Sequence, residues 1–218
     1  MNRPLAFLVF PVVTLLTAAG FMRGGWAVIT VEDLPTALNV RGTTPFAFMV
    51  RQHGVSPLAD LEPTISMWEG RDTLSFSAAA GAKKGLYSAD LRAPRAGEWR
   101  VRINSGFRDM KLELLPIPTT PRVVAIADHG HRLFVAKGCI TCHQGRGTPK
   151  PLITAPDLSQ PRFAPDYLKA FIANPAIRPP TNPQLRMPNL ELKPAEIDAI
   201  VAYLSAPVTA TNTTSPRR

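Results

Sequence analysis

The stretch Cys139-Ile140-Thr141-Cys142-His143 decides how this sequence is interpreted. It contains both cysteines of a chain of 218 residues. Two cysteines cannot build the disulfide-dense scaffold of a small secreted domain. They also cannot supply four thiolates to a zinc ion or an iron–sulfur cluster. The informative feature is therefore their spacing: two residues separate the cysteines, and a histidine follows the second directly.

The spacing C-x-x-C-H is that of an attachment site for a c-type haem. Two thiols separated by one helical turn add to the two vinyl groups of the porphyrin, and the adjacent imidazole lies under the iron and binds it. Cys139 and Cys142 are therefore the candidate attachment residues, and His143 is the candidate iron ligand. Covalent attachment holds the haem without a large pocket, so a small domain is sufficient.

Three other uses of the two cysteines compete with haem attachment. A zinc site needs two more ligands, for which His129 and His131 are available. We expect both on the same helix as the cysteines, with His131 about 18 Å from His143 at 1.5 Å per residue, which is too far to complete a tetrahedron. We expect both histidines to be solvated near the helix start. A thioredoxin-like dithiol needs a βαβ context, which is absent. A disulfide between the two cysteines remains an alternative for a chain without haem.

The segments that flank the motif follow the order found in the monohaem class I cytochromes c. The segments that carry this resemblance are Gly130-His131-Arg132-Leu133-Phe134, Ala155-Pro156-Asp157-Leu158, residues 167–172, Arg186-Met187-Pro188 and residues 194–204. Residues 126–206 thus resemble an all-α class I cytochrome c domain. The resemblance implies one covalent haem c on Cys139 and Cys142, with His143 and Met187 as axial iron ligands. It also implies that the loop of Pro156 orients the His143 ring through its backbone.

Elimination points to the same sixth ligand. Met187 is the only methionine after the haem motif, and no histidine follows His143. A thioether favours ferrous iron and raises the reduction potential. The alternative is that Met187 only packs against the edge of the porphyrin.

Residues 28–118 predict an all-β domain, because apolar and polar residues alternate in short runs separated by turn-forming residues. We expect six to eight strands in an immunoglobulin-like sandwich, each with one buried and one wet face. Residues 85–91, followed by Pro94, Gly97 and Trp99, resemble the last hairpin of immunoglobulin-like domains of the copper-resistance/YtkA type. The resemblance makes His53, Met49 and Met67 the candidate copper ligands, although one isolated histidine is a poor copper site. We expect a structural or docking module instead.

The two ends of the chain and the linker complete the predicted organisation. Residues 1–27 predict a signal peptide or an N-terminal membrane anchor, because Arg3 precedes an apolar run over residues 5–22. Residues 119–125 predict an extended linker and residues 207–218 a disordered tail. Arg3 favours a cytoplasmic N-terminus, which places the remaining chain in the periplasm or elsewhere outside the cytoplasm.

The formal net charge of +9 is concentrated in the C-terminal part of the chain. Residues 28–121 hold 11 basic and 10 acidic residues, whereas residues 122–218 hold 12 and 6. There is no Lys/Arg run of five and no nucleic-acid-binding motif, so nucleic acid is not the expected partner. Single basic residues instead suit a charged docking face for redox proteins.

The expected function is therefore electron transfer, not enzymatic catalysis. The protein is expected to act as a free carrier, or as a tethered subunit of a membrane respiratory or photosynthetic complex. The alternative is a haem enzyme or gas-sensing module in which the iron keeps an open coordination position.

Overall fold

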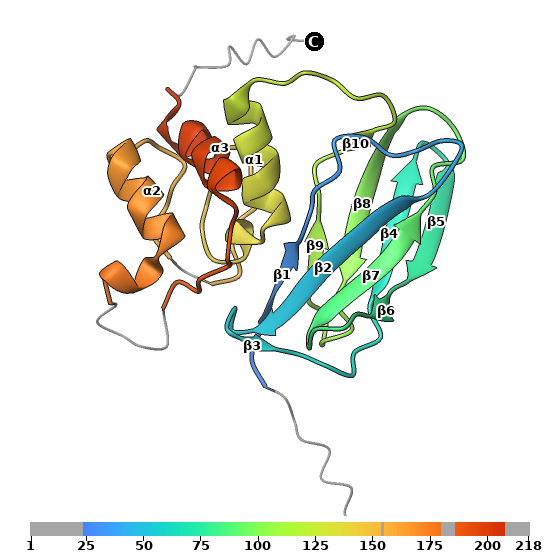
Figure 1. Ribbon diagram of the computed structural model, residues 1–218, viewed down its shortest axis with the longest axis horizontal. Helices are drawn as coiled ribbons and strands as arrows, with labels where there is room; N and C mark the ends of the chain where they lie inside the picture. Colours follow the sequence, from blue (N-terminus) through green and yellow to red (C-terminus); the bar gives the residue numbers. More distant parts are fainter. Residues whose placement is uncertain (1–23, 154, 180–185, 208–218) are drawn as a thin grey trace, which may run out of the picture.

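A computed structural model describes residues 24–153, 155–179 and 186–207. It contains an N-terminal region of β-sheets and a C-terminal region of helices, which lie side by side (Figure 1). The predicted leader over residues 1–27 falls almost entirely outside the described residues, as does the predicted tail over residues 207–218. No helix in the described part of the chain is long and apolar enough to cross a membrane.

From residue 24 onward, the N-terminal region contains two five-stranded sheets in which every pairing is antiparallel. The first sheet has the order β1-β2-β7-β6, with β3 beside β2. Its strands are β1 (Ala27–Val31), β2 (Thr44–Gln52), β3 (Ser56–Pro57), β6 (Ala79–Ala80) and β7 (Leu86–Leu91). The second sheet has the order β10-β8-β4-β5, with β9 beside β8. Its strands are β4 (Thr64–Glu69), β5 (Asp72–Ser77), β8 (Glu98–Asn104), β9 (Lys111–Glu113) and β10 (Ile117–Pro118).

The two sheets share one apolar core, because alternate residues of their strands point toward the same interior. Phe46, Phe48 and Val50 of β2 belong to this core, as do Trp99 and Val101 of β8. All five are at most 1% exposed. The alternation in the sequence therefore correctly marked the core-facing residues. The finer resemblance to immunoglobulin-like and copper-resistance domains stays a prediction.

In the described residues, the C-terminal region contains three helices and two short 3₁₀ turns. These are α1 (Ile126–Ala136), the turn Cys139–Thr141, α2 (Pro165–Ala173), the turn Pro175–Ile177 and α3 (Pro194–Ser205). α1 and α3 cross at Gly130, where a Cβ atom would lie only 1.8 Å from the carbonyl oxygen of Ala199. Phe134 of α1 packs against Tyr203 of α3 with ring centroids 5.4 Å apart. Only glycine permits this approach of the two helices.

The expected continuous helix through the cysteines is wrong. α1 ends at Ala136, and Gly138 adopts a left-handed conformation with φ of 77° before the turn that holds Cys139. A glycine has no Cβ to oppose this conformation, so the chain changes direction directly before the motif. The distance that we expected along one straight helix therefore does not apply.

The expectation that His131 is solvated is also wrong. Its ring is half-buried and stacks on Tyr203 with centroids 4.8 Å apart. Its Nε2 atom is buried and has no hydrogen-bond partner among the described residues. Burial is the main reason that the pKa of His131 lies below its usual value. His131 is thus part of the contact between α1 and α3.

The expectation of one wet face fails for β1 and β2. Thr30 of β1 is 2% exposed, and Met49 and Arg51 of β2 are 8% exposed, although all three point away from the sheet core. The helical region covers this outer face, and Gly138 lies so close to β1 that a Cβ there would be 2.5 Å from the carbonyl oxygen of Ile29. The two regions are therefore packed together at the start of the haem motif.

Lys137 connects the two regions by polar contacts. Its side chain is almost fully buried, and its Nζ atom lies 2.7 Å from Oε1 of Glu196 in α3. The same ammonium donates a hydrogen bond of 2.6 Å to the backbone carbonyl of Glu32, just after β1. Lys193, next to α3, also pairs with Asp33. These contacts fix the position of the haem motif relative to the β-sheet region.

Candidate functional site

The predicted site residues gather around one apolar cavity system between the three helices and β1. A cavity of about 400 Å³ is lined by Cys139, His143, Pro156 and Met187. A second cavity of about 300 Å³ shares these four residues and adds Cys142. The apolar lining of the first cavity comes from Phe134, Leu158, Phe163, Leu168, Phe171, Ile172, Leu190, Leu192, Ile200 and Leu204. The structure thus brings together residues that are 48 positions apart in the chain, from Cys139 to Met187.

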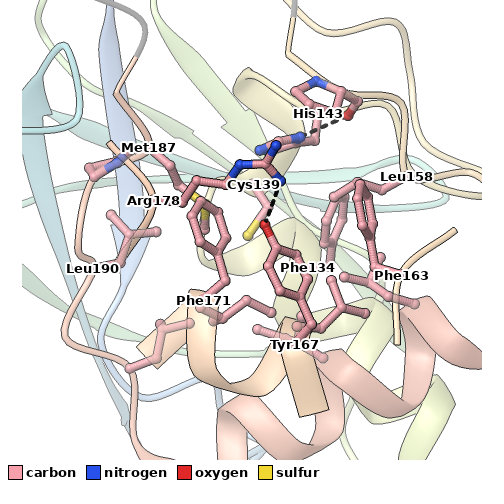
Figure 2. Close-up of a pocket in the computed structure, with 17 residues that line it drawn as sticks. Phe134, Cys139, His143, Leu158, Phe163, Tyr167, Phe171, Arg178, Met187 and Leu190 are labelled. Atoms are coloured by element: carbon pink, nitrogen blue, oxygen red, sulfur yellow. Dashed lines mark hydrogen bonds between the residues drawn. The ribbon is translucent and has the colours of Figure 1, made fainter. Parts of the chain in front are cut away.

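His143 is held in a defined orientation. Its Nδ1 atom lies 2.9 Å from the carbonyl oxygen of Pro156, so the N–H at Nδ1 donates to this oxygen (Figure 2). This hydrogen bond assigns the proton to Nδ1 and leaves Nε2 as the atom with a lone pair for a metal. Burial is the main reason that the pKa of His143 lies below its usual value. A neutral imidazole is the form that binds iron.

The two thiols lie in the turn directly before His143. The backbone N–H groups of Cys142 and His143 both donate to the carbonyl of Cys139, so all three residues follow one tight turn. Burial raises the pKa of the Cys139 thiol to about 12 and that of Cys142 to about 11. Burial therefore disfavours the thiolate form of both side chains.

Met187 approaches the cavity from the segment before α3. It lines both cavities together with Pro188, and its side chain packs against the apolar cluster of the helical region. Figure 2 shows Met187 and His143 on either side of Cys139. A soft thioether, a neutral imidazole and two thiols at the edges of an apolar cavity are a donor set that suits haem c.

Two arginines are the only charged residues that line the cavities in the described part of the chain. They are Arg178 and Arg186. Arg178 donates a hydrogen bond of 3.3 Å to the hydroxyl of Tyr167, which also lines the larger cavity (Figure 2). Cationic groups at the mouth of an apolar cavity attract carboxylates, and haem carries two propionates.

Sequence reasoning missed two residues of the site, Trp26 and Val28. Both line the second cavity, although they belong to the β-sheet region. Their position in the chain, more than 100 residues before the cysteines, gave no signal of this contact. Only the packing of β1 against the helical region reveals it.

Two of the copper candidates of the β-sheet region, Met67 and His53, lie in different environments. Met67 is fully buried in the core between the sheets, whereas His53 is exposed in the turn after β2. The described residues also contain no group of three or more His, Cys, Asp or Glu side chains that could hold a metal ion.

Comparison with known proteins agrees with the donor set. No curated protein matches the chain. Residues 127–206 match the family model described as Cytochrome c, and the match implies covalently bound haem c. The helical region is thus similar to a cytochrome c domain, and it is joined to an N-terminal β-sheet region that the family model does not cover.

Proposed function

We propose that this protein transfers single electrons outside the cytoplasm through one haem c with axial ligands His143 and Met187. Cys139 and Cys142 form the two thioether bonds. Haem c supplies one-electron chemistry, because its iron cycles between the ferric and ferrous states. The observation that carries the proposal is the convergence of these four side chains on one apolar cavity.

The protein side of the site favours a carrier. Pro156 holds the imidazole of His143 through its carbonyl, and a ligand fixed in this way does not swing away when the iron changes charge. Met187 is next to Pro188, which also lines the cavity, and a proline fixes the backbone φ angle beside the weaker ligand. Two protein ligands leave the iron without an open position for a substrate.

The surroundings of the site suit redox partners with acidic surfaces. Residues 122–218 carry a surplus of six basic residues, and Arg178 and Arg186 line the cavity mouth. Long-range attraction raises the rate of association with acidic proteins and is weakened by salt. The partner is a soluble redox protein or a membrane respiratory or photosynthetic complex. The leader is either cleaved, which leaves the protein soluble in the periplasm, or retained as an anchor in the inner membrane.

The competing function is a haem enzyme or gas sensor with an open iron position. This function requires that Met187 does not bind the iron. Carbon monoxide distinguishes the two, because it binds rapidly to ferrous haem only where a coordination position is free. We therefore expect the full-length ferrous protein to bind carbon monoxide slowly or not at all, and Met187→Ala to bind it rapidly. Rapid binding to the wild type would favour the competing function.

Covalent attachment is tested separately by the mass of the purified chain. Expression in a periplasm with haem-attachment machinery should add the mass of one haem to the polypeptide. Cys139→Ser or Cys142→Ser should each leave only one thioether bond, which changes the absorption maximum of the ferrous haem after denaturation. A mass without haem in the wild type would refute the proposal at its first step.

A further inference from the structure

The start of the β-sheet region lines one of the two cavities, and the turn after β2 contacts Pro188 beside them. Trp26 and Val28 line the cavity that Cys139, Cys142 and His143 also line. Val28 is 2% exposed and Trp26 is half-buried. An apolar wall of this cavity therefore comes from the β-sheet region and not from the region that resembles a cytochrome.

Trp26 is held in place by the β-sheet region. The backbone N–H of His53 donates a hydrogen bond of 2.9 Å to the carbonyl of Trp26, and the two rings lie 5.4 Å apart. The side-chain amide of Gln52 donates a hydrogen bond of 2.6 Å to the carbonyl of Gly24, two residues earlier. The backbone at Trp26 is thus held by the end of β2 and the turn after it, and the indole packs against the ring of His53.

The same turn reaches the segment of Met187. A Cβ atom on Gly54 would lie 2.7 Å from Cγ of Pro188, the residue after Met187. Gly54 has φ of 73°, a left-handed conformation that glycine adopts without strain. The β-sheet region thus contacts the cavity both beside the cysteines and beside Met187.

We propose that the β-sheet region is a structural part of the haem pocket, in which Trp26 and Val28 contact the porphyrin and exclude water from it. The apolar shell around a metal site controls solvent access and local dielectric, and through them the reduction potential. Ferric haem carries one more positive charge than ferrous haem, so water stabilises the ferric state more. Trp26 and Val28 therefore raise the reduction potential. This proposal rests on haem c at this site but not on coordination of the iron by Met187.

The direct test is nuclear magnetic resonance of the full-length holoprotein with labelled tryptophan indoles. The ferric iron is paramagnetic, and the shift it causes falls with the cube of the distance. We expect the indole N–H of Trp26 to shift most between the ferrous and ferric states. Trp68 is the internal control, because it lies on β4 of the second sheet, over Arg102, and lines neither cavity. A Trp26 shift no larger than that of Trp68 would overturn the proposal, without any mutation and with either sixth ligand.

The functional test measures the reduction potential of two matched variants. Trp26→Ala should lower the potential by an amount equal to at least a threefold change in the equilibrium constant of reduction, or about 30 mV for one electron. Trp68→Ala removes the same side chain from the same region and should leave the potential unchanged. Val28→Thr replaces one methyl group with a hydroxyl at nearly constant volume and should also lower the potential. It provides the test if Trp26→Ala does not fold.

The results separate this proposal from the proposed function. An unchanged potential in both Trp26→Ala and Val28→Thr would show that the β-sheet region does not control the haem. Rapid carbon monoxide binding by the wild type would instead refute the two-ligand carrier and leave the Trp26 shift as predicted.

Discussion

Removal of the Lys137 ammonium should strongly destabilise the helical region. Lys137→Met keeps the length and apolar stem of the side chain and deletes only the charge and its donors. Glu196 is then left with a mostly buried carboxylate, and the carbonyl of Glu32 loses the donor 2.6 Å away. The variant therefore isolates the polar link between α1, α3 and the β-sheet region.

The expected size of the effect follows from the geometry. At 2.7 Å and an effective dielectric constant of about 20, the direct attraction between Lys137 and Glu196 is about 6 kcal/mol. The desolvation of both groups offsets much of this, and breaking a buried pair costs about 3–5 kcal/mol in measured cases. Glu196 keeps one compensating hydrogen bond, because the backbone N–H of Lys193 donates to its Oε2 atom at 2.9 Å. We therefore expect a loss near the lower end, about 3 kcal/mol.

The assay is urea unfolding of the full-length holoprotein, followed by the haem absorption that reports on the helical region. The control is Lys169→Met, because Lys169 forms an equally short pair with Asp198, also 2.7 Å, but on the exposed surface. It should unfold like the wild type. In the Glu196→Gln background, Lys137→Met should cost clearly less, because no carboxylate is left unpaired. A loss below about 1 kcal/mol for Lys137→Met in the wild-type background would refute this account of the buried pair.

Three further variants test other parts of the structure. Gly130→Ala should cost at least about 3 kcal/mol of stability in thermal unfolding, because its Cβ would lie 1.8 Å from the carbonyl oxygen of Ala199 and neither helix can yield cheaply. Burial lowers the pKa of His131 in the folded state, so below about pH 6.5 the unfolded state binds more protons and is stabilised relative to the folded state. The wild type should therefore lose stability between pH 7.5 and pH 5. His131→Phe should lose less, as measured by urea unfolding at both pH values. Arg186→Gln should reduce the rate of electron transfer with an acidic partner roughly two- to threefold at low salt, in stopped-flow measurements, with a weaker dependence on ionic strength.

Each of these variants has a matched control or an outcome that would contradict it. Gly24→Ala adds a methyl group where no atom of the described residues lies within 4 Å, and it should be neutral. A wild-type pH dependence of stability in His131→Phe would contradict the role of His131. Lys150→Gln removes one charge at an exposed position that lines neither cavity, so a loss equal to that of Arg186→Gln would show a general charge effect instead of a local docking face.

The cofactor could be predicted from the sequence, because the pattern for haem attachment lies in contiguous residues. The pentapeptide from Cys139 to His143 has one dominant chemical use, and the family model for Cytochrome c covers it. Gly130, Phe134 and Tyr203 lie in two segments that each resemble a helix of the cytochromes c, and that resemblance is also visible in contiguous residues. The structure places these residues in contact.

The sequence could not predict the contact between the two regions, because periodicity reports only which residues are polar. Thr30 and Arg51 alternate with apolar residues and therefore indicated a wet face, yet the helical region buries them. Lys137 gave no signal either, because a lysine before a glycine is typical of an exposed helix end. Its burial follows from two acceptors, Glu196 and the carbonyl of Glu32, which are distant in the chain. The same absence of a local signal hid Trp26 from the predicted site.

The break before Cys139 was missed for a different reason. The prediction of one helix through the motif includes Gly138 in that helix. A glycine after the last periodic residue of a helix is the usual signal of its end, and here it has φ of 77°. Greater weight on that signal would have placed the end of α1 correctly.

The central claim, a six-coordinate haem c with one histidine and one methionine ligand, is tested most directly by the absorption spectrum of the ferric full-length protein. A sulfur-to-iron charge-transfer band at the red end of the spectrum is expected in the wild type. The band should be lost in Met187→Ala and kept in Met110→Ala, which removes a methionine that packs against the core of the β-sheet region. A wild-type spectrum without this band and with high-spin features would contradict the claim.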